Sequence, residues 1–467
     1  MVTEVIPVVI VGAGVSGLVA AWQLRQKGID VRVLESENRA GGSVRSEQHA
    51  SFVVDLGPNT ALDTKPCIRE IVNDLGLQSE IQYASDAAKN RYIVRNGKLN
   101  ALPTSPGKFL ASCHFSWKAK ARLALEPFIP ADRKNDDVSL AHFVTRRLGK
   151  EFLDYAIDPF VAGIFAGDPY HLSVRSGFPK LLALEQKYGS ILKGAVLGAS
   201  ERKRSREVSK ASAKMFSFRG GMQKLTDTLA QSLGKDLRLS HCVDEIVPCE
   251  EGFRILGRSV SSNPNGEPFS FLARKVVMAV PAYRASQLVK NFADEASQTL
   301  NSIYYPPVSV VFHGMEKRSS VGSSLDGFGY LIPKLEARQT LGTLWSSTLF
   351  PDRAPLLGAA FTTFVGGARS PRLAFGESKV LHERAWRDVS GFLKISEEPT
   401  LTVSHTWKNA IPQYKVGHHL LVQKLETVEK QFPGFYFLGN YRGGVSMSDC
   451  MGNATQLAAV LAEEAWK

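Results

Sequence analysis

The chain of 467 residues is 44% hydrophobic and 22% charged, a composition typical of a folded globular protein rather than a disordered one. Its length predicts roughly three domains with a large buried core. The formal net charge of +12 favours anionic partners, namely nucleic acid, an acidic membrane surface or an acidic small molecule, without choosing among them.

The N-terminal segment VVIVGAGVSGLVAAWQLRQKGIDVRVLES, residues 8–36, predicts a βαβ unit that binds a dinucleotide. Gly12 permits the tight turn, Gly14 lets the backbone approach a pyrophosphate, and Gly17 lets the helix pack closely on the strand. The helix N–H groups would then point at the phosphates. Glu35 ends the second strand, where its carboxylate would accept hydrogen bonds from the adenosine ribose.

The middle of the chain changes character twice. Residues 67–77 predict an amphipathic helix closed by Gly76. Helical segments that carry aromatic residues then run from Pro103 to about Gly198, which predicts an inserted α-helical domain. The basic run Glu201–Lys210 contains no aromatic residue, so a solvated linker is a better interpretation than a nucleic-acid patch.

The second half returns to strands. A glycine pair, a helix and strands as far as Pro281 resume the α/β domain, and strand-rich segments between Tyr304 and about Lys394 predict an antiparallel sheet. The C-terminus predicts a strand, a glycine-rich turn and a long helix. We therefore expect a dinucleotide-binding domain of residues 1–80, 205–285 and 400–467, a substrate-binding domain of residues 81–104 and 286–399, and a helical domain of residues 105–204.

The cysteines and the apolar segments limit the environment of the protein. Cys67, Cys113, Cys242, Cys249 and Cys450 show no CxxC pair and no metal-ligand spacing, which indicates reduced, mostly packed thiols and no metal site. No apolar stretch is long enough to span a bilayer, so any membrane contact would be peripheral. Because Gly12 comes so early, we expect no signal or transit peptide.

Two further features favour FAD over a diffusing nicotinamide cofactor. The segment RAGGSVRS places the glycine pair 41–42 and Arg45 where the chain must pass a second part of the cofactor, and DLGPNT, residues 55–60, offers a loop for the ring system. The turn 439–444 would direct the positive end of the following helix at the flavin pyrimidine edge, favouring the negative charge that reduction creates there.

With these motifs the sequence resembles the superfamily of flavin-dependent amine oxidases and protoporphyrinogen oxidases. Several blocks in order are similar to the protoporphyrinogen oxidase family, particularly its plant mitochondrial type: RYIVRNGKLNALP, DPFVAGIFAGDPYHLSVRSGFPKL, GFGYLIP, TLGTLWSSTLFPDRAP, FTTFVGG and NAIPQYKVGH. The resemblance covers most of the chain. It implies an α/β fold in which a discontinuous Rossmann-type FAD domain is joined to an α+β substrate domain with an antiparallel sheet and to an inserted α-helical domain.

The resemblance also implies an activity, the oxidation of protoporphyrinogen IX to protoporphyrin IX in heme and chlorophyll biosynthesis, with electrons passing to FAD and then to dioxygen and release of hydrogen peroxide. Hydride abstraction would fall to the flavin, so no catalytic side chain is implied. Arg91 would pair with a propionate of the substrate. The remaining implied substrate contacts are the backbone at Gly167 and the apolar walls Leu331, Leu344 and Phe364.

The FAD contacts implied by the motifs and the resemblance lie in six parts of the chain. They are Gly12, Ala13, Gly14, Val15, Ser16, Gly17, Glu35, Ser36, Gly42, Ser43, Arg45, Gly57, Pro58, Asn59, Thr60, Val243, Trp407, Gly439, Val445, Ser446 and Met447. Val243 would lie opposite the adenine through its backbone. The sequence departs from its plant relatives at Ser43, where others carry a bulkier residue, and in a shorter connection between Leu331 and Leu344.

The helical insert corresponds to the membrane-associating domain of the family. Phe109, Phe115 and Trp117, interleaved with Lys108, Lys118, Lys120 and Arg122, are expected at a lipid interface with their basic neighbours toward anionic headgroups. Packing of this helix on its own domain is the alternative. We expect a peripheral membrane protein, on the cytoplasmic face of a bacterial membrane or on an organelle inner membrane, with no nucleic-acid partner; a homodimer is compatible with this.

Three other functions remain open. A coproporphyrinogen III oxidase would share the fold and the cofactor but take a substrate with four propionates, whereas Arg91 and the plant-like blocks favour two. An amine oxidase would need an aromatic cage, which is not recognisable here. A flavin-free binding protein related to Rab escort and GDP-dissociation-inhibitor proteins would not need the motif at 439–447.

Overall fold

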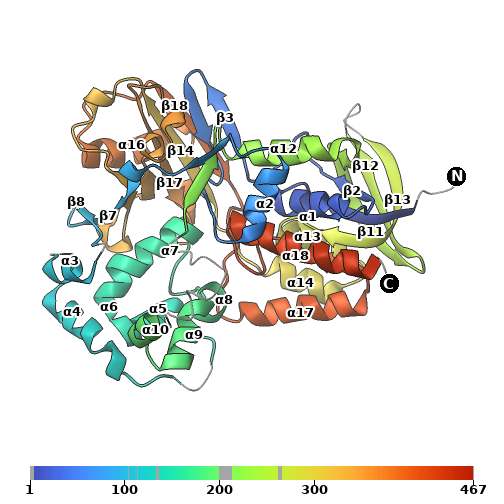
Figure 1. The fold of residues 1–467 in the computed structure, drawn as a ribbon, viewed down its shortest axis with the longest axis horizontal. Coiled ribbons are helices and arrows are strands. Elements are labelled where there is room, and N and C mark those ends of the chain that lie inside the picture. Colours follow the sequence, from blue (N-terminus) through green and yellow to red (C-terminus); the bar gives the residue numbers. More distant parts are fainter. Residues whose placement is uncertain are drawn as a thin grey trace.

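The computed structural model describes residues 5–103, 105–112, 114–132, 136–198, 213–260 and 266–465. The predicted linker Glu201–Lys210 and Cys113 lie outside these residues. Figure 1 shows two sheets side by side, with the helices of the insert below the second sheet and both termini on the side of the first. Of the other four cysteines, all free, Cys67 and Cys242 are half-buried, Cys249 is exposed and Cys450 is buried.

The first sheet contains the predicted βαβ unit. In its described part the strand order is β10-β2-β1-β13-β12-β11, and β19 pairs with the C-terminal end of β13. The strands β10, β2, β1, β13 and β19 run parallel, and β11 and β12 form an antiparallel extension on the first half of β13. The bounds are β1 Val5–Val11, β2 Val31–Leu34, β10 Leu237–Arg238, β11 His241–Cys249, β12 Gly252–Ser259, β13 Glu267–Met278 and β19 Phe435–Phe437.

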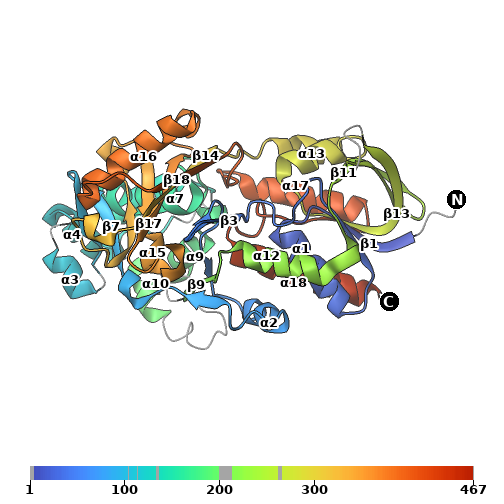
Figure 2. The ribbon, with the colours of Figure 1, turned by 90° about the horizontal axis from the view of Figure 1, so that it is seen from above.

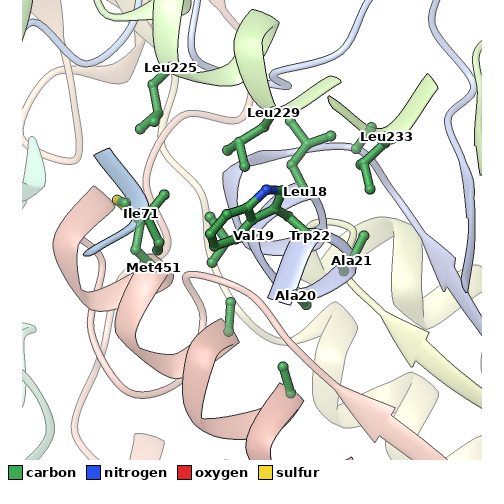
Figure 3. Packing of buried hydrophobic residues seen from close by; sticks show 14 of the residues in the cluster. Leu18, Val19, Ala20, Ala21, Trp22, Ile71, Leu225, Leu229, Leu233 and Met451 are labelled. Atoms are coloured by element: carbon green, nitrogen blue, oxygen red, sulfur yellow. The ribbon is translucent and has the colours of Figure 1, made fainter. Parts of the chain in front are cut away.

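Helices cover both faces of this sheet, and β1 alternates between them with the two-residue period of a strand. Val8 and Ile10 join α1 (Val15–Gln26), α2 (Pro66–Asp74), α12 (Gln223–Leu233) and α18 (Met447–Ala465) in one core. Within this core the Trp22 ring of α1 lies beside Leu229 of α12 (Figure 3).

The opposite face of β1, with Val9 and Val11, packs against α13 (Ala282–Val289), α14 (Asp294–Asn301) and α17 (His418–Gln431), and the two helical layers are seen on either side in Figure 2. The expected domain boundary at residue 285 falls inside α13. Since α14 and Tyr305 belong to the same core, the first unit continues to about residue 305.

The second sheet has the order β18-β14-β17-β16-β15-β7-β8 and is antiparallel except where β7 and β15 run parallel. Its elements are β7 Asn90–Arg95, β8 Lys98–Ala101, β14 Val308–Met315, β15 Gly327–Leu331, β16 Thr340–Leu344, α15 Ser346–Leu349, β17 Ala359–Gly366, α16 Ser378–Leu393 and β18 Leu401–Trp407. The antiparallel strands predicted between Tyr304 and about Lys394 are confirmed as β14, β15, β16 and β17, although α15 follows β16 and α16 occupies the end of this region.

One face of this sheet is covered by α16, through Trp386 and Val389 against Phe361. Strand β18 belongs to this sheet because it pairs with β14 along its whole length. The expected boundaries had instead assigned residues from 400 onward to the dinucleotide-binding domain. The difference arises because the partner of β18 lies some ninety residues earlier in the sequence, beyond the reach of local patterns.

Two small sheets and the helical insert complete the described fold. The small sheets are β3 Ser46–His49 with β4 Phe52–Asp55, and β5 Ala61–Leu62 with β9 Met215–Phe218 and β6 Ile81–Tyr83. The insert consists of α3 Pro106–Ala111, α4 Trp117–Ala124, α5 Leu140–Leu148, α6 Lys150–Phe152, α7 Asp158–Phe165, α8 Val174–Gly177, α9 Pro179–Tyr188 and α10 Ile191–Leu197. No helix of the described chain is long and apolar enough to cross a bilayer.

Part of the expected lipid-facing stripe lies inside the insert, so that expectation is wrong for two residues. Phe115 is buried and stacks on Phe152, with ring centroids 5.6 Å apart. Lys120 is also buried, because its ammonium donates to the carbonyls of Leu110 and Ser112. Trp117 of the expected stripe is exposed, and Leu110, Leu125 and Phe128 near it are exposed as well.

Candidate functional site

Three glycine-containing segments meet at the C-terminal ends of β1 and β2. A Cβ on Gly17 would lie 2.0 Å from the Gly12 oxygen, and one on Gly57 would lie 1.9 Å from the Ser43 oxygen. The 41–45 segment is joined to the first glycine loop by a bridge between Gly14 and Gly41, and Leu56 N–H donates to the Arg45 oxygen at 2.8 Å. These contacts bring together the predicted FAD residues of all three segments.

The N-terminus of α1 is built to receive an anion. Gly12 has φ +104, which turns the chain sharply out of β1, and Gly14 at the N-cap supplies no side chain. A Cβ on Gly14 would meet no heavy atom of the described residues within 4 Å. The first N–H groups of a helix have no partner within the helix, and at this end they attract negative charge.

Glu35 holds this loop in place. Its buried carboxylate accepts hydrogen bonds from the backbone N–H groups of Ala13 at 2.8 Å and Glu37 at 2.9 Å, and from the hydroxyl of Ser36 at 3.2 Å. The backbone oxygen of Glu35 accepts from His241 N–H at 2.8 Å, so β11, which carries Val243, lies beside it. The carboxylate thus fixes the glycine loop in addition to the ribose contact expected from the sequence.

Arg39, which the sequence motifs did not single out, also belongs to this site. Its guanidinium donates to the carbonyls of Ala40, Gly42 and Val44 and so fixes the second glycine segment. Burial lowers the pKa of Arg39, and the neighbouring Arg45 adds to this lowering. Arg45 forms a salt bridge of 2.7 Å with Glu47. The motif RAGGSVRS contains both arginines, and spacing alone does not distinguish them.

The turn before α18 meets the same place from the other end of the chain. Ser446 and Asp449 form a capping box, in which Asp449 N–H donates to the Ser446 hydroxyl at 3.1 Å and Ser446 N–H donates to the Asp449 carboxylate at 3.4 Å. The Ser446 hydroxyl also donates to this carboxylate at 2.6 Å. The Ser448 hydroxyl donates to the Leu62 oxygen at 2.6 Å, which ties α18 to the end of the 57–60 loop.

The starts of α1 and α18 lie side by side. Ser16 on α1 is hydrogen-bonded to the thiol of Cys450 on α18, whose pKa burial raises to about 11. Of the remaining predicted residues in this turn, Met447 is buried in the first core, Val445 packs against the core of the helical insert, and Gly439 approaches the Tyr441 ring.

The second sheet touches the site through Trp407. Its indole N–H donates to the Leu56 oxygen at 2.7 Å, directly before the Gly57 loop. Within that loop the Asn59 amide donates to the Gly57 oxygen at 3.0 Å, and Pro58 and Thr60 are half-buried.

The predicted substrate residues of this sheet share the face opposite α16. Residues that pair across neighbouring strands point to the same side. Leu331 pairs with Ile93 of β7 on one side and with Gly342 of β16 on the other, and Gly342 pairs in turn with Phe364 of β17. Arg91 lies two residues before Ile93 on β7, and Leu344 lies two residues after Gly342 on β16, so both point to the same side. Phe364 continues through Val310 to His405, and Trp407 lies two residues further on β18. One face therefore carries Arg91, Leu331, Leu344, Phe364 and Trp407.

These side chains differ in exposure. Arg91 is exposed, and its guanidinium lies over the Phe328 ring at 5.9 Å from the centroid, whereas the three apolar residues are half-buried. Five strand spacings separate β7 from β18, which corresponds to roughly 24 Å across the face. A flat ligand lying on the central strands would have Arg91 at one end and the Trp407 edge at the other.

Helix α7 ends against this face. Ala166, with φ +47, reverses the chain, and its oxygen accepts from Ala368 N–H at 2.7 Å just beyond β17. A Cβ on Gly167 would lie 2.8 Å from the Gln413 side-chain oxygen, and the Gln413 amide donates to the Phe165 oxygen at 2.8 Å. The expected backbone contact at Gly167 therefore lies close to the strand that carries Phe364.

Comparison with known proteins identifies the family of the chain. The model of the family described as flavin containing amine oxidoreductase matches residues 15–462, so the chain belongs to this class of flavoproteins. The mitochondrial protoporphyrinogen oxidase of Nicotiana tabacum is 36% identical, with 97% of this chain and 94% of the relative covered. The chain is thus a member of the protoporphyrinogen oxidase family, as its sequence blocks indicated.

Two more distant matches extend the comparison, one by sequence and one by fold. Coproporphyrinogen III oxidase of Bacillus subtilis strain 168 is 26% identical, with 95% of both chains covered. A solved structure from Exiguobacterium sp. 255-15 matches with a TM-score of 0.81 at 22% identity, covering 99% of this chain and all of the other. The α/β fold class and FAD as cofactor are thereby confirmed.

The residues of this site fit FAD. The open space at Gly14 in front of the α1 N-terminus suits a pyrophosphate, and Glu35 stands at the tip of β2, where a ribose is bound in such folds. The α18 N-terminus closes the same region.

Proposed function

We propose that the chain oxidises protoporphyrinogen IX to protoporphyrin IX, with dioxygen as the electron acceptor and hydrogen peroxide as the second product. The observation that carries the proposal is the single sheet face shared by Arg91, Leu331, Leu344 and Phe364, with Trp407 touching the Gly57 loop at its edge. The names of the relatives support the same substrate class.

The sheet face supplies binding and orientation. A tetrapyrrole is a large apolar disc, and burial of its surface against Leu331, Leu344 and Phe364 contributes about 25 cal/mol for each Å² removed from water. Gly329 and Gly342 lie between these side chains and leave the face flat. The Arg91 guanidinium, exposed at one end of the face, would bind a propionate through two charge-assisted hydrogen bonds and so fix which edge of the disc points inward.

The glycine segments hold the cofactor. Bound FAD supplies the chemistry by accepting a hydride from a carbon of the substrate. The α1 N-terminus would hold the pyrophosphate and Glu35 the ribose, and the α18 N-terminus would stabilise negative charge at the pyrimidine edge, an effect worth about 0.3–2 kcal/mol. One proton leaves the substrate with each hydride and passes to water, so the proposal assigns no side chain as an acid or a base, and the chain contributes the orientation of the substrate and the electrostatic field of its helix ends.

Oxidation of coproporphyrinogen III is the second candidate, favoured by the Bacillus subtilis relative. The purified protein should be assayed with both porphyrinogens under air, with porphyrin fluorescence and hydrogen peroxide measured in parallel. We expect a higher kcat/KM for protoporphyrinogen IX and one peroxide for each pair of hydrogens removed. A preference for the tetracarboxylate substrate, or turnover without peroxide, would contradict the proposal.

We also propose that the insert binds a membrane surface peripherally. The support is the group of exposed apolar side chains Leu110, Trp117, Leu125 and Phe128, close to the exposed Lys108 and Lys118. Such a mixture favours the interface of an anionic bilayer. Sedimentation with anionic liposomes at low salt should be lost in the double variant Trp117→Ser/Phe128→Ser and kept in Leu356→Ser, a control at an exposed leucine outside the insert.

A further inference from the structure

The segment 411–418 lies between the helical insert and the glycine turn before α18 and contacts both. On the side of the insert, Ser173 N–H donates to the Tyr414 oxygen at 2.8 Å, and Leu172 forms a bridge with Lys415. The Asp137 carboxylate accepts from Gly417 N–H at 2.7 Å and from the Ser173 hydroxyl at 2.6 Å. The backbone of this segment is therefore fixed by the insert.

On its other side the segment holds the turn. The buried hydroxyl of Tyr414 accepts a hydrogen bond from Gly444 N–H at 3.1 Å and donates one to the Asn440 oxygen at 2.7 Å. The His418 ring is stacked on the Tyr414 ring with centroids 4.1 Å apart, and its Nε2 contacts the Tyr441 oxygen at 2.8 Å. Burial raises the pKa of Tyr414 well above its usual value, so the hydroxyl stays protonated and keeps both roles.

The turn needs such an anchor. Gly443 and Gly444 have φ +72 and +120, and glycines are the residues with the greatest conformational freedom. The capping box fixes Ser446 and the first turn of α18, and Tyr414 is placed to fix residues 440–444. The direction of the α18 N-terminus relative to the other cofactor segments depends on both.

We infer that Tyr414 is a positioning residue for FAD: it holds the turn 440–444, and through Asp137 and Ser173 the helical insert holds Tyr414. The inference rests on the proposed function, because that function places the pyrimidine edge beside the α18 N-terminus. Tyr414 acts through the turn and needs no contact with substrate.

The test compares two tyrosine variants of the purified holoenzyme. Tyr414→Phe removes both hydrogen bonds to the turn. Tyr330→Phe is the matched control, since its buried hydroxyl accepts from the Thr343 hydroxyl at 2.9 Å on the α16 face of the second sheet. The readouts are the visible spectrum, the midpoint potential and the dissociation constant of bound FAD, together with KM for protoporphyrinogen IX.

For Tyr414→Phe we expect a more negative midpoint potential, an altered flavin spectrum and FAD binding weakened by roughly three- to tenfold, because the cofactor senses only part of the free energy of the two hydrogen bonds that the turn loses. KM should stay within twofold of the wild type. Tyr330→Phe should leave all four quantities unchanged. A flavin in Tyr414→Phe identical to the wild type, or an equal shift in Tyr330→Phe, would overturn the inference.

Asp137→Asn tests the connection from the insert and serves if Tyr414→Phe does not fold. This variant weakens the hydrogen bonds from Gly417 and Ser173 to residue 137. It should therefore shift the midpoint potential in the same direction as Tyr414→Phe, by a smaller amount. An unchanged potential in this variant would refute the role of the insert. The wild-type protein separates failure of the proposed function from failure of this inference. A wild type that binds no FAD or oxidises no porphyrinogen refutes the proposed function. An active wild type with unaffected variants refutes only the inference about Tyr414.

Discussion

Gly163 on α7 and Leu331 on β15 are in direct contact, because a Cβ added to Gly163 would lie 2.7 Å from Leu331 Cδ2. This contact sets how closely α7 approaches the proposed substrate face. Gly163→Ala must displace the end of the flexible Leu331 side chain, so the fold should tolerate the change while the apolar wall of the proposed substrate face changes shape. We expect KM for protoporphyrinogen IX to rise up to about tenfold, which corresponds to ~1.4 kcal/mol of lost substrate binding, with FAD content unchanged. Gly177→Ala, where a Cβ meets no described atom within 4 Å, is the control and should behave as wild type in steady-state kinetics.

Arg91→Ala should weaken substrate binding and leave FAD in place. A charge-assisted bidentate pair contributes about 1.5–3 kcal/mol, so KM should rise roughly tenfold to a hundredfold. Arg91→Lys keeps the positive charge but cannot bind a carboxylate through two parallel hydrogen bonds, so its KM should lie between those of the wild type and of Arg91→Ala. Flavin absorbance at equal protein concentration measures FAD retention. Normal KM in Arg91→Ala would remove the propionate contact from the proposal.

The local patterns predicted much of this fold. The βαβ unit, the strands of the second sheet and the C-terminal helix follow from apolar periodicity and from glycines at fixed spacing, which are properties of short segments. The extent of each domain did not follow. Strand β18 and helices α13 and α14 are assigned by partners far away in sequence, and no short window contains that information.

The candidate site divides in the same way. The three glycine segments were predicted because each needs a particular backbone path, and the structure brings them together. Arg39 and Tyr414 were missed, since what they do depends on carbonyls and N–H groups of other segments. Phe115 and Lys120 fit an amphipathic surface stripe in sequence, yet Phe152 and two carbonyls cover them.

The buried Arg353 connects the second sheet to the Gly57 loop. It donates to Asp55 at 2.9 Å and to the Ser217 hydroxyl at 2.6 Å, and Asp55 precedes Leu56 and Gly57. Arg353→Met leaves Asp55 as an uncompensated buried charge, which costs about 3–5 kcal/mol. We expect urea unfolding at lower concentration and partial loss of FAD. Arg258→Met, which breaks an exposed pair with Asp244, should change the unfolding midpoint little; equal effects would show that the Arg353 pair adds no more stability than a surface pair.

Stability should fall as the solution becomes acidic, because of His313. Burial lowers the pKa of His313 to about 3, against about 6.5 in the unfolded chain. Below pH 6.5 the unfolded chain therefore binds a proton at His313 that the folded protein does not bind. The contribution of neutral His313 to the free energy of unfolding is lost as the pH falls from 6.5 toward 3.

Between pH 7 and pH 5 this group should remove about 2 kcal/mol of unfolding free energy. Urea titrations at the two pH values measure the loss. His313→Gln no longer titrates, so its loss over the same interval should be smaller by that amount. An identical pH dependence in the two proteins would show that His313 is protonated without cost in the folded state.

Two glycines of one motif should respond oppositely to alanine. A Cβ on Gly17 would lie 2.0 Å from the Gly12 oxygen, so Gly17→Ala must separate α1 from β1 and destabilise the protein even without a cofactor. A Cβ on Gly14 meets no described atom within 4 Å, and its backbone is extended at φ −69, which alanine adopts freely. Gly14→Ala should therefore keep the thermal stability of the apoprotein.

Gly14→Ala should nevertheless weaken FAD binding at least tenfold, since its methyl group would occupy the space in front of the α1 N-terminus where the pyrophosphate is expected. Titration of the apoproteins with FAD, followed by flavin fluorescence, measures the affinity, and thermal unfolding of the same samples measures the stability. If Gly14→Ala binds FAD like the wild type, the pyrophosphate lies elsewhere and the predicted contacts from Gly12 to Gly17 are wrong.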